Sequence, residues 1–88
     1  MTEKELEKIL KAVANKRRLA ILRFLKKNKE GTVTEIAEAI KLSFKSTSRH
    51  LVVLCASDIV DREQRSVEAF YSLSPTAFSV IKQLISML

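Results

Sequence analysis

Residues 42–54, LSFKSTSRHLVVL, separate two kinds of side chain onto opposite sides of a helix. The stripe expected to pack inward consists of Leu42, Thr47, Leu51 and Leu54. The opposite face carries hydroxyls, cations and an imidazole, from Ser43, Lys45, Ser46, Ser48, Arg49 and His50. A second short helical pattern, TVTEIAEAI at residues 32–40, precedes this one across a tight turn. Two short helices joined in this way predict a helix-turn-helix.

The outward face of residues 42–54 suits a nucleic acid better than plain solvent. It holds two permanent positive charges, and no carboxylate occurs between Leu42 and Ala56. A solvated structural face normally mixes both signs of charge, whereas cations and hydroxyls match phosphate oxygens and base edges. The residues predicted to contact DNA on this face are Ser43, Phe44, Lys45, Ser46, Ser48 and Arg49.

Three residues on this helix have competing interpretations. Arg49 is the best candidate for reading a base, because a guanidinium can engage guanine in a bidentate manner, but it could equally clamp a phosphate. Phe44 could touch a thymine methyl group, or it could pack on Val33 or on a partner subunit. A histidine beside a leucine-rich core edge is more often packed and hydrogen-bonded than free, so His50 is predicted to be structural.

The composition predicts one mainly helical domain spanning residues 1–88. The chain has one glycine and one proline, which leaves little room for loops, and its hydrophobic content of 47% supplies a core. No apolar run approaches the roughly 20 residues of a membrane span, and the polar, mixed-charge start is unlike a signal peptide. We therefore expect a cytoplasmic protein with no membrane partner.

The positive charge is concentrated early in the chain. The formal net charge is +6, and residues 1–31 hold ten basic against four acidic residues, whereas residues 32–88 hold six of each. A basic balance fits a nucleic-acid partner, although many basic proteins bind none. The recognition candidate is thus a local basic spot in a neutral half.

The remaining elements follow from periodicity and capping signals. A first helix is predicted around Leu6–Val13, with Thr2 and Glu5 at capping-box spacing. Asn15 is expected to cap a second helix that closes at residues 26–29 before Gly31. Residues 32–33 are expected to pair briefly as a strand, with Thr34 capping the third helix and Ser43 the fourth. Strands at 59–62 and 67–73, with their tip at 63–66, precede a last helix that starts at Ser74-Pro75.

This order of elements is a winged helix-turn-helix, and two segments make a resemblance specific. The segment ANKRRLAILRFL is similar to the second helix of the arsenic-repressor (ArsR) family of bacterial and archaeal regulators. The recognition unit of that family is matched by Leu42, Ser43, Ser48, Arg49, His50, Leu51 and Leu54. The segment IVDREQRSVEAFYSLSP resembles the family's wing. Departures are Thr47 where a buried valine is usual, Phe44 where a small or polar residue is usual, and Asp58 where glycine is common at a left-handed position.

The resemblance implies DNA contacts outside the fourth helix as well. In the wing, Arg62 and Arg65 are candidate phosphate contacts, but the surrounding carboxylates give this hairpin a net charge of −1, which should repel a phosphate backbone. At the start of the second helix, Arg17 is a further DNA candidate, with a salt bridge to a glutamate of the first helix as the alternative. The match of Arg18 to a family arginine favours a structural or mixed role.

The missing ligands argue against metal sensing, which the family name suggests. Family members that bind soft metals carry cysteines on the third helix, and those that bind zinc or nickel use histidine and acidic residues on the last helix; this chain has neither set. It has one cysteine, Cys55, for which a small partly buried filler is favoured over a redox switch. No catalytic constellation appears, so we expect no cofactor and no enzymatic activity.

The apolar terminal helices predict a two-fold homodimer. The last helix is apolar around most of its circumference, more than one small domain needs to bury, and the first helix has its own apolar stripe. The predicted interface comprises Leu6, Ile9, Leu10, Phe78, Ile81, Leu84, Ile85 and Leu88. The alternative is burial of the last helix within one chain.

These features predict a sequence-specific, double-stranded DNA-binding transcriptional regulator: a dimeric repressor without a metal site, acting on a pseudo-palindromic operator. The rival interpretations are a winged helix used for protein or RNA contact, and a non-specific nucleoid-type DNA binder.

Overall fold

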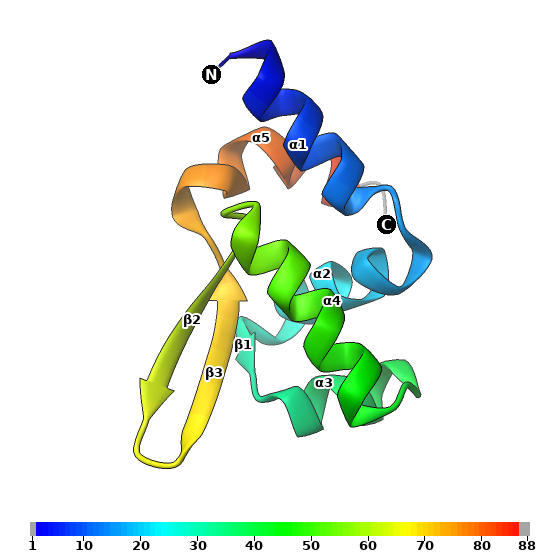
Figure 1. Ribbon diagram of the computed structural model, residues 1–88, viewed down its shortest axis with the longest axis vertical. Helices are drawn as coiled ribbons and strands as arrows, with labels where there is room; N and C mark the ends of the chain where they lie inside the picture. The colour runs from blue at the N-terminus through cyan, green and yellow to red at the C-terminus, as the bar shows by residue number, and fades with distance from the viewer. Residues whose placement is uncertain (1, 87–88) are drawn as a thin grey trace.

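The computed structural model describes residues 2–86, apart from the side chains of residues 76–78, 80 and 85 in the last helix. It is mainly helical with a small antiparallel sheet, as predicted (Figure 1). The elements are α1 (Glu3–Val13), α2 (Lys16–Asn28), β1 (Glu30–Gly31), α3 (Val33–Ile40), α4 (Phe44–Ala56), β2 (Val60–Arg65), β3 (Glu68–Leu73) and α5 (Pro75–Ser86). This is the predicted winged helix-turn-helix, in which α3 and α4 form the helix-turn-helix and β2–β3 the wing.

The predicted helix starts are largely confirmed by the caps. Thr2 and Glu5 form a reciprocal capping box on α1. The Asn15 side chain accepts hydrogen bonds from the backbone N–H groups of Arg17 and Arg18, at 2.9 and 3.1 Å, at the start of α2. These bonds satisfy amides that the helices leave without an internal partner.

The start of α3 differs from the prediction. Its cap is Thr32, not Thr34: the Thr32 hydroxyl accepts from the Glu35 N–H, and the Glu35 carboxylate accepts from the Thr32 N–H at 2.8 Å. The Thr-x-x-Glu spacing makes this reciprocal pair available only from residue 32. The short strand therefore lies earlier than expected, at Glu30–Gly31, and not at residues 32–33.

Gly31 lies at the end of β1, where the chain passes into α3, rather than at the end of α2. A Cβ atom at this position would lie 2.7 Å from the Phe24 ring and 3.3 Å from Ile36. Helix α2 instead ends at Asn28, and Lys29 takes up the positive φ of 71° that follows. The glycine is thus needed for close packing of β1 on α2.

The wing is longer than predicted and its tip lies later. Strands β2 and β3 pair antiparallel from Val60↔Leu73 to Arg65↔Glu68, and β1 pairs with the other edge of β3, giving the order β1-β3-β2. The tip is therefore Ser66-Val67, and residues 63–65 belong to β2. Because residues 61–65 of β2 are all exposed, its polar and charged side chains show no alternation with apolar ones, and they look like a turn in the sequence.

The core is centred on α2 and fixes the orientation of α4. Fully buried side chains come from most elements, namely Ile21, Leu22, Leu25, Ile36, Thr47, Leu51, Leu54, Ile59, Val60 and Ile81. Burial of Leu51 and Leu54, at about 1.5–3 kcal/mol each, holds the predicted apolar stripe of α4 inward. The polar face of α4 consequently points outward. Within residues 2–86, no helix combines the length and apolarity needed to cross a bilayer.

Candidate nucleic-acid interface

Helix α4 begins after a capping residue, Ser43, and the backbone N–H groups ahead of the capped one can face an anion. The Ser43 hydroxyl accepts from the Ser46 N–H at 3.1 Å, and the Ser43 carbonyl accepts from the Thr47 N–H at 3.0 Å. The predicted cap is therefore confirmed. The first amides of α4 beyond this cap remain oriented along the helix axis, where a phosphate is favoured.

Two cations lie one turn apart on the outward face of α4. Lys45 and Arg49 are both exposed, and neither pairs with a carboxylate within residues 2–86. Ser48 lies half-buried beside them, and Val52 continues the same face with 64% of its surface exposed. Because residues four apart are neighbours on a helix, Lys45, Arg49 and Val52 form one continuous outward strip.

His50 is anchored on the flank of α4 and takes no part in this strip. The Arg18 Nη1 atom lies 3.3 Å from His50 Nδ1, while Arg18 Nε donates to the Ala12 carbonyl. Arg18 thus connects the end of α1 to the middle of α4. The structural roles favoured for both residues agree with this geometry.

The Arg18 contact defines the protonation of His50. A guanidinium only donates, so His50 Nδ1 accepts and the proton of the neutral ring lies on Nε2. Partial burial lowers the pKa of His50 below its usual value, and the positive charges of Arg18 and Arg17 lower it further. His50 is therefore neutral at pH 7 and adds no charge to the α4 face.

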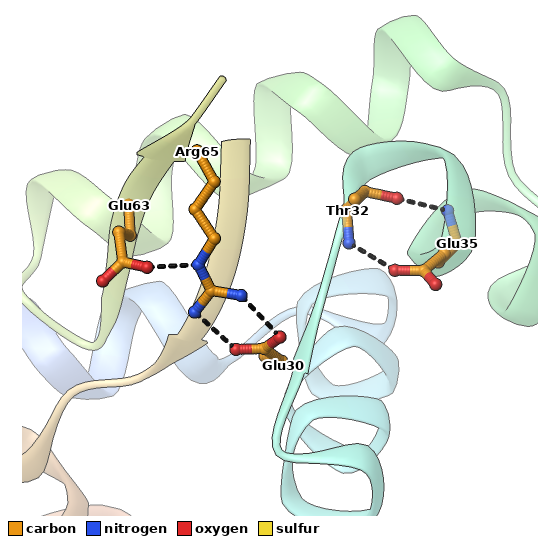
Figure 2. A network of polar contacts seen from close by, with 5 residues as sticks. All are labelled: Glu30, Thr32, Glu35, Glu63 and Arg65. Atoms are coloured by element: carbon orange, nitrogen blue, oxygen red, sulfur yellow. Dashed lines mark hydrogen bonds and ion pairs between the residues drawn. The ribbon is translucent and has the colours of Figure 1, made fainter. Parts of the chain in front are cut away.

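In the wing, Arg65 is engaged within the protein. Figure 2 shows its guanidinium between Glu30 of β1 and Glu63 of β2, with Nη1 and Nη2 donating to the two Glu30 oxygens at 2.8 and 2.9 Å and Nε paired with Glu63. The same group stacks 4.4 Å from the centre of the Phe70 ring. Arg65 thus links the wing to β1 through its ion pairs, and two carboxylates neutralise its charge.

The pKa shifts of Glu30 and Arg65 agree with these contacts. Hydrogen bonding to Arg65 lowers the pKa of Glu30, and the Glu30 and Glu63 carboxylates raise the pKa of Arg65. Arg62, the other predicted wing contact, donates to the Gln64 side chain at 2.9 Å and remains exposed. Of the two wing arginines, Arg62 is therefore the one whose charge is available to a phosphate.

A hollow of about 280 Å³ separates α4 from the wing. Phe44, with 60% of its surface exposed, and Val67 at the wing tip lie on its edges, and Ser48, Arg62 and Glu68 also line it. Val33 lines it too, so Phe44 lies near Val33, one of the alternatives that the sequence left open for it. No sequence pattern indicates this hollow, because its lining comes from separate segments at the start of α3, on α4 and in the wing.

The predicted DNA residues thus fall into one cluster and two outlying positions. Ser43, Phe44, Lys45, Ser46, Ser48 and Arg49 lie together on the first half of α4, and Arg62 shares the adjoining hollow. Arg17 is exposed at the start of α2, close enough to affect the His50 pKa. Arg65 lies at the far end of β2 in its own ion pairs.

The predicted dimer residues divide between surface and core. Leu6, Leu10 and Leu84 expose 39%, 44% and 44% of their surface, whereas Ile9 and Ile81 are buried in the core of the protomer itself. Ile9 and Ile81 already have intramolecular partners, as in the single-chain alternative. Leu88 lies outside the described residues, and so do the side chains of Phe78 and Ile85.

The described residues bring no cluster of potential metal ligands together. Within the described part of the chain, no three His, Cys, Asp or Glu residues gather closely enough to hold one. His50 is committed to Arg18. Cys55 is partly buried on α4, and burial raises the pKa of its thiol, which disfavours the thiolate that metals bind.

Comparison with known proteins supplies the family context of this fold. A model of the arsR family of bacterial regulatory proteins matches residues 15–62, from the α2 cap into the wing. The transcriptional activator HlyU of Vibrio cholerae is 36% identical over 80 residues, covering 91% of this chain and 73% of HlyU. The structure of reduced HlyU superimposes with a TM-score of 0.83 at 34% identity, covering 97% of this chain and 85% of that one.

Two further solved structures are similar. The transcriptional repressor PagR of Bacillus anthracis matches with a TM-score of 0.80 and 30% identity, over 92% of this chain and 93% of PagR. The homodimeric winged helix-turn-helix DNA-binding domain Mb0332 from Mycobacterium bovis matches with a TM-score of 0.84 and 25% identity, over 96% of this chain and 77% of that one.

Proposed function

Because the chain belongs to the arsR family of bacterial regulatory proteins, we propose that it binds one double-stranded DNA operator sequence-specifically through α4. It is a winged helix-turn-helix transcription regulator and not an enzyme. The observation that carries the proposal is the unpaired Lys45–Arg49 strip on an acid-free helix face.

In the proposed complex, the first half of α4 enters the major groove. Arg49 reads a guanine through two hydrogen bonds, while Lys45, Ser46, Ser48 and the first amides of α4 hold phosphates. Arg17 and Arg62 contact the flanking backbone from either side. Arg65 contributes indirectly, because its bonds to Glu30 hold the wing at the angle that leaves Arg62 beside α4.

The functional unit in this proposal is a two-fold homodimer formed by α1 and α5. Leu6, Leu10 and Leu84 are large apolar side chains that remain exposed on one protomer, and the Mb0332 domain is homodimeric. A two-fold axis would present two α4 helices about one DNA turn, ~34 Å, apart and thus match a pseudo-palindromic operator. Sedimentation equilibrium of wild type and Leu84→Glu tests this: the wild type should have twice the chain mass and the variant one. A wild type with the mass of one chain at micromolar concentration would refute it.

We also propose repression in the cytoplasm without a metal signal. PagR is a repressor, and an occupied operator blocks polymerase without a further binding site, whereas HlyU is an activator. A reporter gene fused to the selected operator distinguishes repression from activation. If the protein is a repressor, deleting the gene that encodes it should raise reporter expression. Equilibrium dialysis against zinc, nickel, cadmium and arsenite should find no tight site, and one tight metal per chain would contradict the proposal.

The central experiment is operator selection from random duplexes, followed by titration of Arg49→Ala and the matched control Lys4→Ala. Loss of a bidentate base contact should weaken operator binding by about 1–3 kcal/mol, or about 5- to 150-fold in Kd, and relax preference at one base pair. Lys4 is an exposed cation on α1, so its loss should change affinity little.

The same titration separates the rival functions. Specific binding should weaken steeply with salt and survive at moderate salt. Equal affinity for every duplex would indicate a nucleoid-type binder, and no duplex binding would indicate a protein- or RNA-contact module. Unchanged affinity of Arg49→Ala, with a normal circular dichroism spectrum, would refute the assignment of α4.

A further inference from the structure

Helix α2 carries an excess of positive charge, of which the proposed operator complex uses only Arg17. Residues 16–29 contain seven of the sixteen lysines and arginines and no acidic residue, so the rest of the chain holds nine cations against ten carboxylates. The excess charge of the protein is therefore located on one helix. Apart from the Arg18 contacts, no cation of α2 has an ion pair within the described residues.

The free cations lie on the side of α2 that faces away from the core. Lys16, Arg23 and Lys27 follow helical spacing along one stripe about 16 Å long, opposite the buried Ile21 and Leu25. In Figure 1, α4 lies in front of α2.

The stripe borders a hollow of about 460 Å³ between α2 and α3, here called the α2–α3 hollow. Its lining combines apolar side chains with two cations and one amide: Ala20, Arg23, Phe24, Lys27, Asn28, Ala39 and Ile40. No carboxylate lines it. Ala39 is exposed, and Phe24 and Ile40 are half-buried, so an incoming side chain can reach apolar surface between the cations.

We propose that the α2–α3 hollow docks an acidic segment of another protein that inserts an apolar side chain. Carboxylates of that segment pair with Arg23 and Lys27, and the apolar anchor covers Phe24, Ala39 and Ile40. The mixed chemistry selects a protein partner over a second duplex, because a phosphate backbone offers no apolar group for the hollow. Docking there leaves α4 on the operator, so the regulator can hold DNA and the partner together.

Fluorescence anisotropy with two labelled peptides tests the proposal on the full chain. One peptide is glutamate-rich with a single central phenylalanine, and its twin has serine in that place; a non-operator duplex is the third probe. The paired variant Arg23→Ala, Lys27→Ala is compared with Lys4→Ala, Lys8→Ala, which removes two exposed cations from α1.

The wild type should bind the phenylalanine peptide, with amide shifts confined to α2 and α3, and the serine twin should bind about tenfold more weakly. The Arg23→Ala, Lys27→Ala variant should bind the phenylalanine peptide more weakly by a similar factor and should keep its operator affinity. The α1 control variant should keep its affinity for the peptide and for the operator. Equal binding of both peptides, shifts centred on α4, or displacement of the peptide by the duplex would overturn the proposal. Operator binding is measured separately, so its failure would refute the proposed function and leave this docking test intact.

Discussion

Replacing Thr47, on the inner side of α4, with valine should raise the free energy of unfolding. The Thr47 side chain is completely buried, and its hydroxyl has no hydrogen-bond partner within the described residues. A buried hydroxyl without a partner costs about 1–3 kcal/mol relative to its hydrated state. Valine has nearly the same shape, so Thr47→Val removes that cost and replaces the hydroxyl with a methyl group in the same space.

The expected gain in the free energy of unfolding is about 1–2 kcal/mol, because part of the hydroxyl cost is already relieved by local relaxation. Both residues are β-branched, so helix propensity contributes little to the difference. For a domain of this size, each kcal/mol corresponds to about 4–8 °C in Tm. Urea unfolding at fixed protein concentration measures the gain directly, since a dimer would make Tm depend on concentration.

Thr47→Ser is the matched control, because it retains the hydroxyl and removes the methyl group. It should destabilise the protein by about 1 kcal/mol through lost burial and a small cavity. Operator affinity should be the same for both variants, since Thr47 faces the core. A Thr47→Val protein less stable than wild type would mean that the hydroxyl has a hydrogen-bond partner, and it would refute the argument.

Three further changes probe other contacts. Gly31→Ala should lower stability by about 1–3 kcal/mol in urea unfolding, because its Cβ would meet the Phe24 ring at 2.7 Å; an unchanged midpoint would contradict this packing. The pKa of Glu30 is lowered in the folded protein, so its contribution to folding stability is present above the unfolded pKa and is lost as the pH falls through the folded pKa. In a measurement of stability against pH, Glu30→Gln should therefore reduce the loss of stability at acid pH, whereas the control Glu3→Gln should not. The pKa of His50 is also lowered, so protonation favours the unfolded chain and stability should decline as the pH falls below about 6.5; an NMR titration placing the His50 pKa above that value would refute the neutral ring.

The periodic features of this protein were accessible from the sequence. Helical spacing predicts an inward stripe of Leu42, Thr47, Leu51 and Leu54. The structure buries the last three, whereas Leu42 precedes α4 and is only partly buried. The Asn15 and Ser43 caps follow from side chains that bond amides two or three residues away. These interactions are local in the chain, so residue type and spacing are enough to predict them.

Where two local signals competed, the sequence was ambiguous. Thr32 and Thr34 can each cap a helix, and only the reciprocal bond with Glu35 selects Thr32. In the wing, the run of polar residues 61–66 is compatible with a turn or a strand. Pairing with β3 decides for a strand up to Arg65, because ladder hydrogen bonds depend on a partner in the other strand and not on residue type alone.

The roles of individual charged and apolar side chains were decided by the tertiary structure. Arg65 looks like a DNA contact in the sequence, yet Glu30, 35 residues away, lies within hydrogen-bond reach of its guanidinium once β1 and β2 flank β3. Ile9 and Ile81 look like interface residues, yet they are buried in the protomer. Sequence patterns set which faces are apolar or charged, but the partner of each face depends on how distant segments pack, because burial and ion pairing are properties of neighbours in space.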